Sequence, residues 1–286
     1  MTDHELRDRL AAMNLGPKRV GGQWQARCPC HDDRGPSLRA TIAPSGKLLL
    51  HCFAGCPFTA IRGALGIGMQ VSFTPVAYSV PERAAFPESA WWSIRGTDTP
   101  GTVEEKEKSL GLPVGGLRRV GAVWAAALAA IACPMLEAPH GQTIGVRLRA
   151  DDGRKWAITG SRNGLFCPAT FGGEGCLYLP EGLTDTAALV GLGLDAVGRP
   201  SCMGGREMLV KWLRGNKREI VVVSDRDEPG RRGADALAAD LTKEHHRVKV
   251  LVPPSPWKDA RAWVQGGATR ETIAFAARHR ALWSPA

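Results

Sequence analysis

Cysteine and histidine residues gather in one short stretch near the N-terminus. The stretch reads Cys28-Pro29-Cys30-His31, then twenty further residues, then Cys52-Phe53-Ala54-Gly55-Cys56. Two ligands two residues apart can hold one tetrahedral ion from a tight turn, and a second pair returned by a hairpin completes the site. We therefore predict one zinc ion held by Cys28, His31, Cys52 and Cys56. Cys30 and His51 remain open as replacements for a member of this set.

Ordinary buried thiols are the alternative explanation for this cluster. Four of the eight cysteines fall within 29 residues and are paired at both ends, which chance rarely arranges. About 70 residues with few apolar side chains bury only a small core, and zinc ligation can supply ~10–16 kcal/mol of apparent binding free energy. The scattered cysteines are predicted to be core residues: Cys133, Cys167, Cys176 and Cys202.

A second group of candidate ligands consists of carboxylates at the ends of expected strands. Glu181 follows the apolar residues 177–179, and Asp225 and Asp227 follow the apolar run 220–223. Alternation along an extended strand would put Asp225 and Asp227 on one face. A lone acid after a strand is usually a turn former or helix cap, but three converging carboxylates need a cation. Oxygen ligands favour Mg²⁺ or Mn²⁺, and Asp259 after the next strand is a further candidate.

The elements that position these carboxylates alternate between strands and helices. Strands are expected at 176–180, 219–224 and 247–252, with helices at 184–192, 207–213 and 233–244. This alternation predicts an α/β unit with a mostly parallel sheet, in which ligands bind at the carboxyl ends of the strands. We expect the α/β fold class for this half of the chain and α+β for the chain overall.

The first half of the chain is expected to be more varied. A helix should end near residue 15, and β-like residues 38–50 between the cysteine pairs fit a zinc ribbon. Residues 70–100, with several prolines, indicate a linker or irregular segment. Short helices are expected at 104–110 and 114–120, and strands at 143–149 and 155–159. The apolar stretch 120–136 is shorter than the ~20 residues of a membrane span, so we predict buried core.

These patterns divide the chain into four parts. Residues 1–70 are a zinc-binding domain, 71–140 a linker and the helical part of a catalytic core, 141–174 a subdomain of basic strands, and 175–286 the parallel-sheet domain with a C-terminal helix. Hydrophobic residues make up 44% and charged residues 23% of the chain, which excludes wholesale disorder.

The motifs resemble those of a known family. The run 181–185 (Glu-Gly-Leu-Thr-Asp), the run 224–232 (Ser-Asp-Arg-Asp-Glu-Pro-Gly-Arg-Arg) and Lys258-Asp259 are similar to the three acidic motifs of the Toprim fold. The cysteine pairs resemble the zinc-binding domain of bacterial and phage DnaG-type primases. Residues 145–149, 153–155 and 160–166 resemble the basic strands that precede Toprim in phage and plasmid primases. The resemblance covers residues 20–65 and 140–265 in the same order.

The resemblance implies roles for particular residues. Glu181, Asp225 and Asp227 would hold the catalytic Mg²⁺ or Mn²⁺, with Glu181 also assisting proton transfer. Asp185 would support the site through hydrogen bonds, and Asp259 would complete its rim. Two departures from the family are the three residues between Cys52 and Cys56, where cellular primases have two, and a third acidic motif without a second acid.

Basic and aromatic residues are candidates for contacts with nucleotides and template. The basic set is Arg147, Arg149, Lys155 and Arg162, although on exposed strands these side chains could equally form a solvated face. Trp91 and Trp92 could stack on bases, but a packing role is the preferred interpretation.

The function implied is that of a DNA primase, which makes short RNA primers on single-stranded DNA from ribonucleoside triphosphates. One alternative is a metal-dependent Toprim nuclease; a tyrosyl intermediate is disfavoured because only Tyr78 and Tyr178 exist and Tyr178 falls in an expected strand. Another is a zinc-dependent protein that binds single-stranded DNA and regulates replication. The chain has no Gly-x4-Gly-Lys-Ser/Thr loop, so a helicase would be a separate partner.

The net charge of +9 is unevenly distributed. Residues 1–70 carry 9 basic and 5 acidic side chains, residues 71–140 carry 6 and 7, residues 141–180 carry 5 and 3, and residues 181–286 carry 17 and 13. The basic excess marks the zinc-binding and catalytic parts as two strand-binding surfaces. The N-terminus lacks an apolar signal core. We expect no membrane partner and a cytoplasmic location in a bacterial cell, with a phage, plasmid or mobile-element origin compatible with the motifs.

Overall fold

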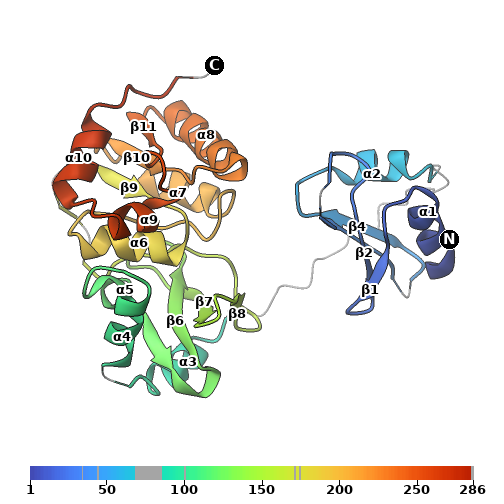
Figure 1. Ribbon diagram of the computed structural model, residues 1–286, viewed down its shortest axis with the longest axis horizontal. Coiled ribbons are helices and arrows are strands. Elements are labelled where there is room, and N and C mark those ends of the chain that lie inside the picture. The colour runs from blue at the N-terminus through green and yellow to red at the C-terminus, as the bar shows by residue number, and fades with distance from the viewer. Residues whose placement is uncertain are drawn as a thin grey trace. The chain divides into compact units, whose positions relative to one another are not determined.

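The computed structural model describes residues 1–33, 35–43, 45–67, 86–99, 101–170, 172–173 and 175–284. The chain forms two compact units, Met1–Ser79 and Val80–Ala286 (Figure 1). Each unit has its own hydrophobic core, so each is described by itself.

The N-terminal unit is a small antiparallel sheet flanked by two helices. Helix α1 (Asp3–Ala12) begins at Thr2, whose side chain and that of Glu5 form a reciprocal capping box. The sheet has the order β1-β2-β3-β4, with strands β1 (Lys18–Val20), β2 (Gln23–Ala26), β3 (Leu38–Ile42) and β4 (Leu48–Cys52). Helix α2 (Phe58–Ala64) follows. Only nine residues form its buried core, two of them cysteines, so this unit has little hydrophobic stabilisation of its own.

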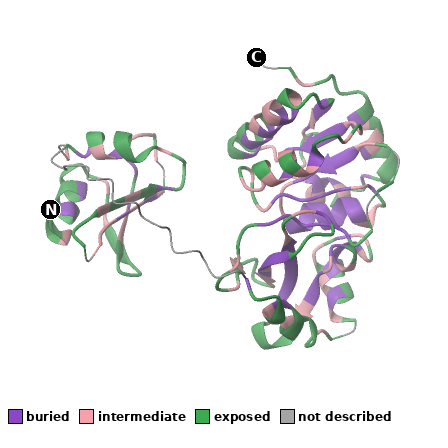
Figure 2. Ribbon diagram, turned by 180° about the vertical axis from the view of Figure 1, so that it is seen from behind, coloured by how far each residue is buried: buried purple, intermediate pink, exposed green. Residues whose placement is uncertain are grey.

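The second unit begins with helices and an antiparallel sheet. The helices are α3 (Glu88–Arg95), α4 (Thr102–Ser109) and α5 (Gly116–Arg119). The sheet has the order β5-β6-β7-β8, with strands β5 (Val123–Ala125), β6 (Ala130–Leu136), β7 (Thr143–Ala150) and β8 (Lys155–Ala157), and a 3-10 turn, η1 (Ala126–Leu128), joins β5 to β6. Figure 2 shows burial concentrated in the strands of this unit.

A parallel sheet of order β11-β10-β9 completes the second unit. Its strands are β9 (Leu177–Leu179), β10 (Ile220–Val223) and β11 (Val248–Leu251), and its helices are α6 (Gly182–Gly191), α7 (Arg206–Leu213), α8 (Glu228–Lys243), α9 (Ala260–Gln265) and α10 (Arg270–Arg278). All of β10 is buried, and its alternate residues enter two different hydrophobic clusters. The sheet is therefore covered on both faces, as parallel sheets require.

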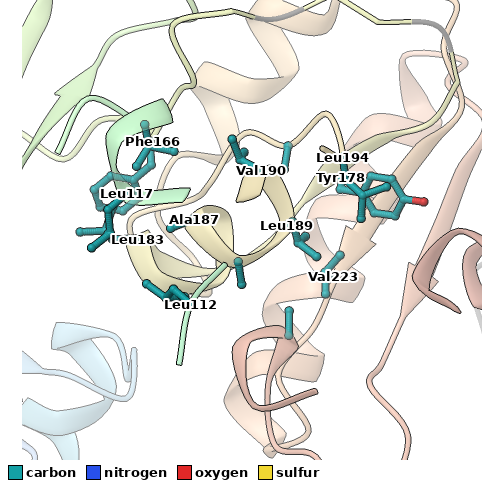
Figure 3. Close-up of a cluster of buried hydrophobic side chains, with 14 of the residues drawn as sticks. Leu112, Leu117, Phe166, Tyr178, Leu183, Ala187, Leu189, Val190, Leu194 and Val223 are labelled. Atoms are coloured by element: carbon teal, nitrogen blue, oxygen red, sulfur yellow. The ribbon is translucent and has the colours of Figure 1, made fainter. Parts of the chain in front are cut away.

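One hydrophobic cluster joins the antiparallel sheet to the parallel sheet. Figure 3 shows Leu183 of α6 close to Leu117 of α5 and to Phe166. The two helices pack so tightly that a Cβ atom on Gly116 would lie 2.3 Å from the carbonyl oxygen of Ala187. Backbone bridges from Leu136 to Leu165 and from Phe166 to Gly198 also link the two sheets. The two halves of this unit therefore share one hydrophobic core.

The predicted α/β class with an N-terminal ribbon-like sheet is confirmed. The expectation of irregular structure around residue 90 is wrong for Glu88–Arg95, which is helical: Pro87 stands at the N-cap, where a proline is tolerated, and Trp91 is buried. Most of the remaining linker prediction, 68–85, lies outside the described residues. The antiparallel sheet crosses the expected boundary at residue 140, because the apolar stretch 120–136 forms β5 and β6. Over the described residues, no helix combines the length and apolarity needed to span a bilayer.

Candidate metal centres

The four predicted zinc ligands converge in the N-terminal unit. The ligand atoms of Cys28, His31, Cys52 and Cys56 all lie within 4.8 Å of one another, and His31 Nδ1 is 3.3 Å from Cys56 Sγ. Cys28 follows β2 and Cys52 ends β4, and the register of β2, β3 and β4 brings these two strand ends together. Three thiols and one imidazole in this arrangement can hold a tetrahedral zinc ion.

The two reserve candidates do not join this group. Cys30 packs against the core of the unit, and the ring of His51 makes an edge-to-face contact with Phe53 at 4.8 Å between centroids. Burial raises the pKa of Cys28 to about 12. The pKa of Cys52 is lowered to about 7, because hydrogen bonds from the backbone of Cys56 and from Ser37 outweigh the effect of burial. Metal binding at this group would therefore release protons.

Asp33 supports this site, and the sequence analysis did not identify it. Its carboxylate accepts hydrogen bonds from the Cys28 amide at 2.7 Å and from the Ser37 hydroxyl at 2.6 Å, and lies 3.6 Å from His31 Nε2. Burial acts to raise the pKa of Asp33, but these hydrogen bonds lower it to about 2. A carboxylate behind Nε2 leaves Nδ1 of His31 free to face the metal. The available signal was an acid two residues after a candidate histidine ligand.

The carboxylate site lies at the carboxyl edge of the parallel sheet. Glu181 follows β9 and stands at the N-cap of α6, and Asp225 comes two residues after the end of β10. These two residues, with Asp185 and Asp259, line a cavity of about 350 Å³. The structure thus brings four of the five predicted acids to one space, at the edge expected for ligands in a parallel sheet.

Glu181 and Asp225 are the carboxylates of the cavity best suited to hold a cation. Glu181 Oε2 is buried and has no hydrogen-bond partner among the residues that the structure describes. Burial raises the pKa of Glu181. Burial, reinforced by the charges of Glu181 and Asp259, raises the pKa of Asp225 to about 6. Carboxylates that are desolvated and crowded in this way gain most from a bound divalent ion.

Asp185 is the deepest of these acids, with 8% of its surface exposed. It accepts a hydrogen bond of 2.8 Å from the backbone amide of Arg261. Burial and the charge of Asp259 raise its pKa. The Asp185 carboxylate therefore ties α6 to α9 beneath the cavity.

Asp227 and Asp259 cap helices. Asp227 Oδ1 accepts from the amide of Gly230 at 2.9 Å, and Asp259 Oδ1 accepts from the amide of Ala262 at 2.7 Å. The argument from strand alternation is wrong, because β10 ends at Val223, before both Asp225 and Asp227. Asp227 does not line the cavity, although its charge raises the pKa of both Glu181 and Asp225.

The carboxylates of the cavity are more widely spaced than the zinc ligands. Within the described parts of the chain, Cys28, His31, Cys52 and Cys56 are the one group of three or more such ligands with ligand atoms this close together. Mg²⁺ commonly takes one or two carboxylates and completes its octahedron with water and phosphate oxygens. The unpartnered Glu181 oxygen beside Asp225 fits such an ion.

Basic side chains line the same cavity, and those of β7 and β8 form its basic wall. Arg147 and Arg149 of β7 and Lys155 of β8 line it, and burial lowers the pKa of each. Arg162 is exposed and does not line it. Lys258 and Arg261 do line it, and the sequence analysis did not single them out as basic contacts. Their signal was their position beside Asp259 in the third acidic motif.

The tryptophan pair divides between two environments. Trp91 is buried against the antiparallel sheet, whereas Trp92 is 55% exposed and has the guanidinium of Arg95 over its ring at 5.1 Å. The packing interpretation is thus right for Trp91. Of the scattered cysteines, Cys133 and Cys167 are buried and Cys176 and Cys202 are partly buried, and all four are free thiols.

The fold of the chain is similar to that of DnaG-type primase domains. The chain is similar to the zinc-binding and RNA polymerase domains of Aquifex aeolicus primase, with a TM-score of 0.54 and 16% identity, over 98% of this chain and 86% of that one. It is also similar to a DnaG primase catalytic domain bound to single-stranded DNA (TM-score 0.52, 13% identity, 68% of this chain and 80% of that one) and to a DnaG catalytic core (TM-score 0.51, 13% identity, 66% and 76%). No protein-family model matches the chain. No curated protein sequence matches it either. At these identities the likeness establishes the fold.

Proposed function

We propose that the chain is a DNA primase, which synthesises short RNA primers on single-stranded DNA by metal-dependent nucleotidyl transfer. The observation that carries this proposal is the cavity at the carboxyl edge of the parallel sheet, which four carboxylates and five basic side chains line together. A reaction that joins two phosphorylated substrates needs acids that hold a metal cation and basic side chains that hold the phosphates.

In this proposal each wall of the cavity has its own task. Glu181 and Asp225 hold Mg²⁺ or Mn²⁺, Asp227 and Asp259 contribute negative charge from the starts of α8 and α9, and Asp185 holds the floor. The bound ion would stabilise the attacking 3′-oxygen and the departing pyrophosphate. Glu181 would also assist transfer of the proton from the attacking hydroxyl.

The basic wall would bind the phosphates. Arg149, Lys155 and Arg261 hold their charge partly away from water, so a triphosphate or template phosphate that reaches them replaces lost hydration with charge-assisted hydrogen bonds. Lys258 and Arg147 extend this wall. Arg162, which lies outside the cavity, is assigned to the template strand.

The remaining parts complete the proposal. Residues 1–70, with one zinc ion, would contact the template. Residues 71–174 would supply Arg147, Arg149 and Lys155 of the basic wall, and residues 175–286 would supply the acids together with Lys258 and Arg261. A separate helicase would open the duplex, and the protein would act in the cytoplasm of a bacterial cell, with a phage or plasmid as a compatible source.

Primer synthesis tests the proposal directly. The protein is incubated with single-stranded templates, ribonucleotides and Mg²⁺ or Mn²⁺, and the products are separated by length. We expect short RNA products from the native chain, a loss of at least a hundredfold in Glu181→Gln and Asp225→Asn, and full activity in Glu207→Gln, a control with an exposed carboxylate on α7. Full synthesis by both site variants would exclude this carboxylate site.

The same assay separates the competing functions. Metal-dependent nicking of plasmid DNA without nucleotides would identify a nuclease; Tyr178 is buried in β9, and Tyr78 lies outside the described residues. Template binding without incorporation on a library of single-stranded sequences would identify a binding protein.

A further inference from the structure

Arg199 is a fully buried arginine directly beside the carboxylate site. Its exposed fraction is 0%, and it heads the largest fully buried side chains of the protein. Its backbone lies along the free edge of β9: the Arg199 amide donates to the carbonyl of Pro180 at 2.9 Å, and its carbonyl accepts from the amide of Gly182 at 2.7 Å. Arg199 therefore holds the residues on both sides of Glu181.

The guanidinium reaches two further chain segments. Nη1 donates to the carbonyl of Cys202 at 2.8 Å, and Nη2 donates to the carbonyl of Val223, the last residue of β10, at 3.2 Å. Asp225 follows two residues later. Through its backbone and its guanidinium together, Arg199 thus joins the ends of β9 and β10 and the segment that follows it.

The charge of Arg199 is not neutralised by direct contact. Both of its hydrogen bonds go to neutral carbonyls, its Nε has no partner in the described structure, and no acid there lies within ion-pair distance of it. A buried cation in this state is costly unless nearby charges compensate it. Burial lowers the pKa of the Arg199 guanidinium, and the charges of Glu181 and Asp225 act in the opposite direction.

We propose that Arg199 is a positioning residue that supplies a permanent positive charge at the base of the carboxylate site. It compensates Glu181 and Asp225 when no metal is bound and repels cations that enter. The second consequence rests on the proposed metal site. A fixed charge of +1 beneath the carboxylates reduces the divalent charge that they can hold, so Arg199 keeps metal binding weak and exchangeable.

The first test is a double-mutant cycle in buffer without Mg²⁺ or Mn²⁺, which does not depend on the proposed function. Arg199→Gln keeps hydrogen-bond donors but removes the charge. We expect it to lower the urea midpoint, and we expect Glu181→Gln added to it to raise the midpoint again, because the uncompensated carboxylate is then gone. Arg206→Gln, which loses the half-buried partner Asp240 on α8, is the control and should be additive with Glu181→Gln.

The second test measures Mn²⁺ binding by titration calorimetry. We expect Arg199→Gln to bind Mn²⁺ about five- to tenfold more tightly than the native chain, because the repelling charge is absent. Arg199→Lys, which keeps the charge but loses the planar fork, should bind as the native chain does while being less stable. Arg206→Gln should leave Mn²⁺ affinity unchanged.

The outcomes separate this inference from the proposed function. Additive effects of Arg199→Gln and Glu181→Gln on the midpoint would overturn the counter-charge, whatever the chain binds. Equal or weaker Mn²⁺ binding by Arg199→Gln would overturn the proposed repulsion of cations. The role of Arg199 would then be limited to its hydrogen bonds. A native chain that binds no Mn²⁺ would contradict the proposed metal site and the repulsion together, whereas coupling in the cycle would still establish the counter-charge.

Discussion

Neutralising Asp225 should make the metal-free protein more stable while removing its response to divalent ions. Burial and neighbouring carboxylates raise the pKa of Asp225 from 3.8 to about 6. Each pKa unit corresponds to about 1.4 kcal/mol, so the ionised side chain costs the folded state up to about 3 kcal/mol at pH 8. Asp225 is partly exposed and solvent screens part of this cost, so we expect Asp225→Asn to gain about 1–3 kcal/mol.

The gain should depend on pH in a defined direction. The folded state binds the Asp225 proton more tightly than the unfolded chain, so the cost is absent below pH 3.8, grows as the pH rises and is complete above about 6. At pH 5 the difference between the variant and the native chain should be about half of its value at pH 8.

Urea denaturation followed by tryptophan fluorescence measures this difference. The native chain, Asp225→Asn and the exposed control Glu207→Gln are compared at pH 5 and pH 8. Each is measured without Mg²⁺ and with Mg²⁺ at a concentration on the order of millimolar. We expect Mg²⁺ to raise the midpoint of the native chain and of the control, but not that of Asp225→Asn. A variant less stable than the native chain at pH 8, or a difference that grows toward pH 5, would refute the assignment of Asp225 as a desolvated, crowded carboxylate.

Three further predictions concern the rest of the chain. Chelation of zinc should unfold Met1–Ser79 and leave the circular dichroism of the second unit intact, since the first core is small; retention of its structure in excess chelator would contradict this. Asp33→Ala should weaken zinc binding about 10–100-fold in a competition titration, whereas the exposed neighbour Asp32→Ala should not. Glu107 is 1% exposed and accepts hydrogen bonds from the amides at the start of α5, so Glu107→Gln should cost about 2–3 kcal/mol in urea denaturation and the exposed Glu105→Gln less than about 0.5 kcal/mol.

Residues whose role follows from local spacing were predictable. Cys28 and His31 lie in one turn and Cys52 and Cys56 in another, so pairs of ligands are visible in the sequence before any fold is known. The apolar run of β10 likewise predicts a buried strand. An acid that follows this strand lies at the carboxyl edge of the sheet, whatever the order of the strands.

Residues whose role depends on tertiary packing were not predictable. Asp227 follows Asp225 by two residues, yet it caps the N-terminus of α8 and does not line the cavity. Lys258, just before α9, and Arg261, in α9, also line the cavity, and Arg199 is a charged residue that the fold buries completely. Side-chain type suggests exposure for arginine, and only the packed structure shows the exception.

The hydrophobic core that the two halves of the second unit share affects the electrostatic field of the cavity. Leu117 and Phe166, from the half that carries the basic strands, pack with Leu183, from the half that carries the acids. Since α5 and α6 also meet at Gly116 without room for a methyl group, the separation between the two walls of the cavity is fixed by apolar contacts. A substitution that thins this core would therefore change the distance between opposite charges without replacing any charged residue, so the apolar positions of this core also set the electrostatic field of the cavity.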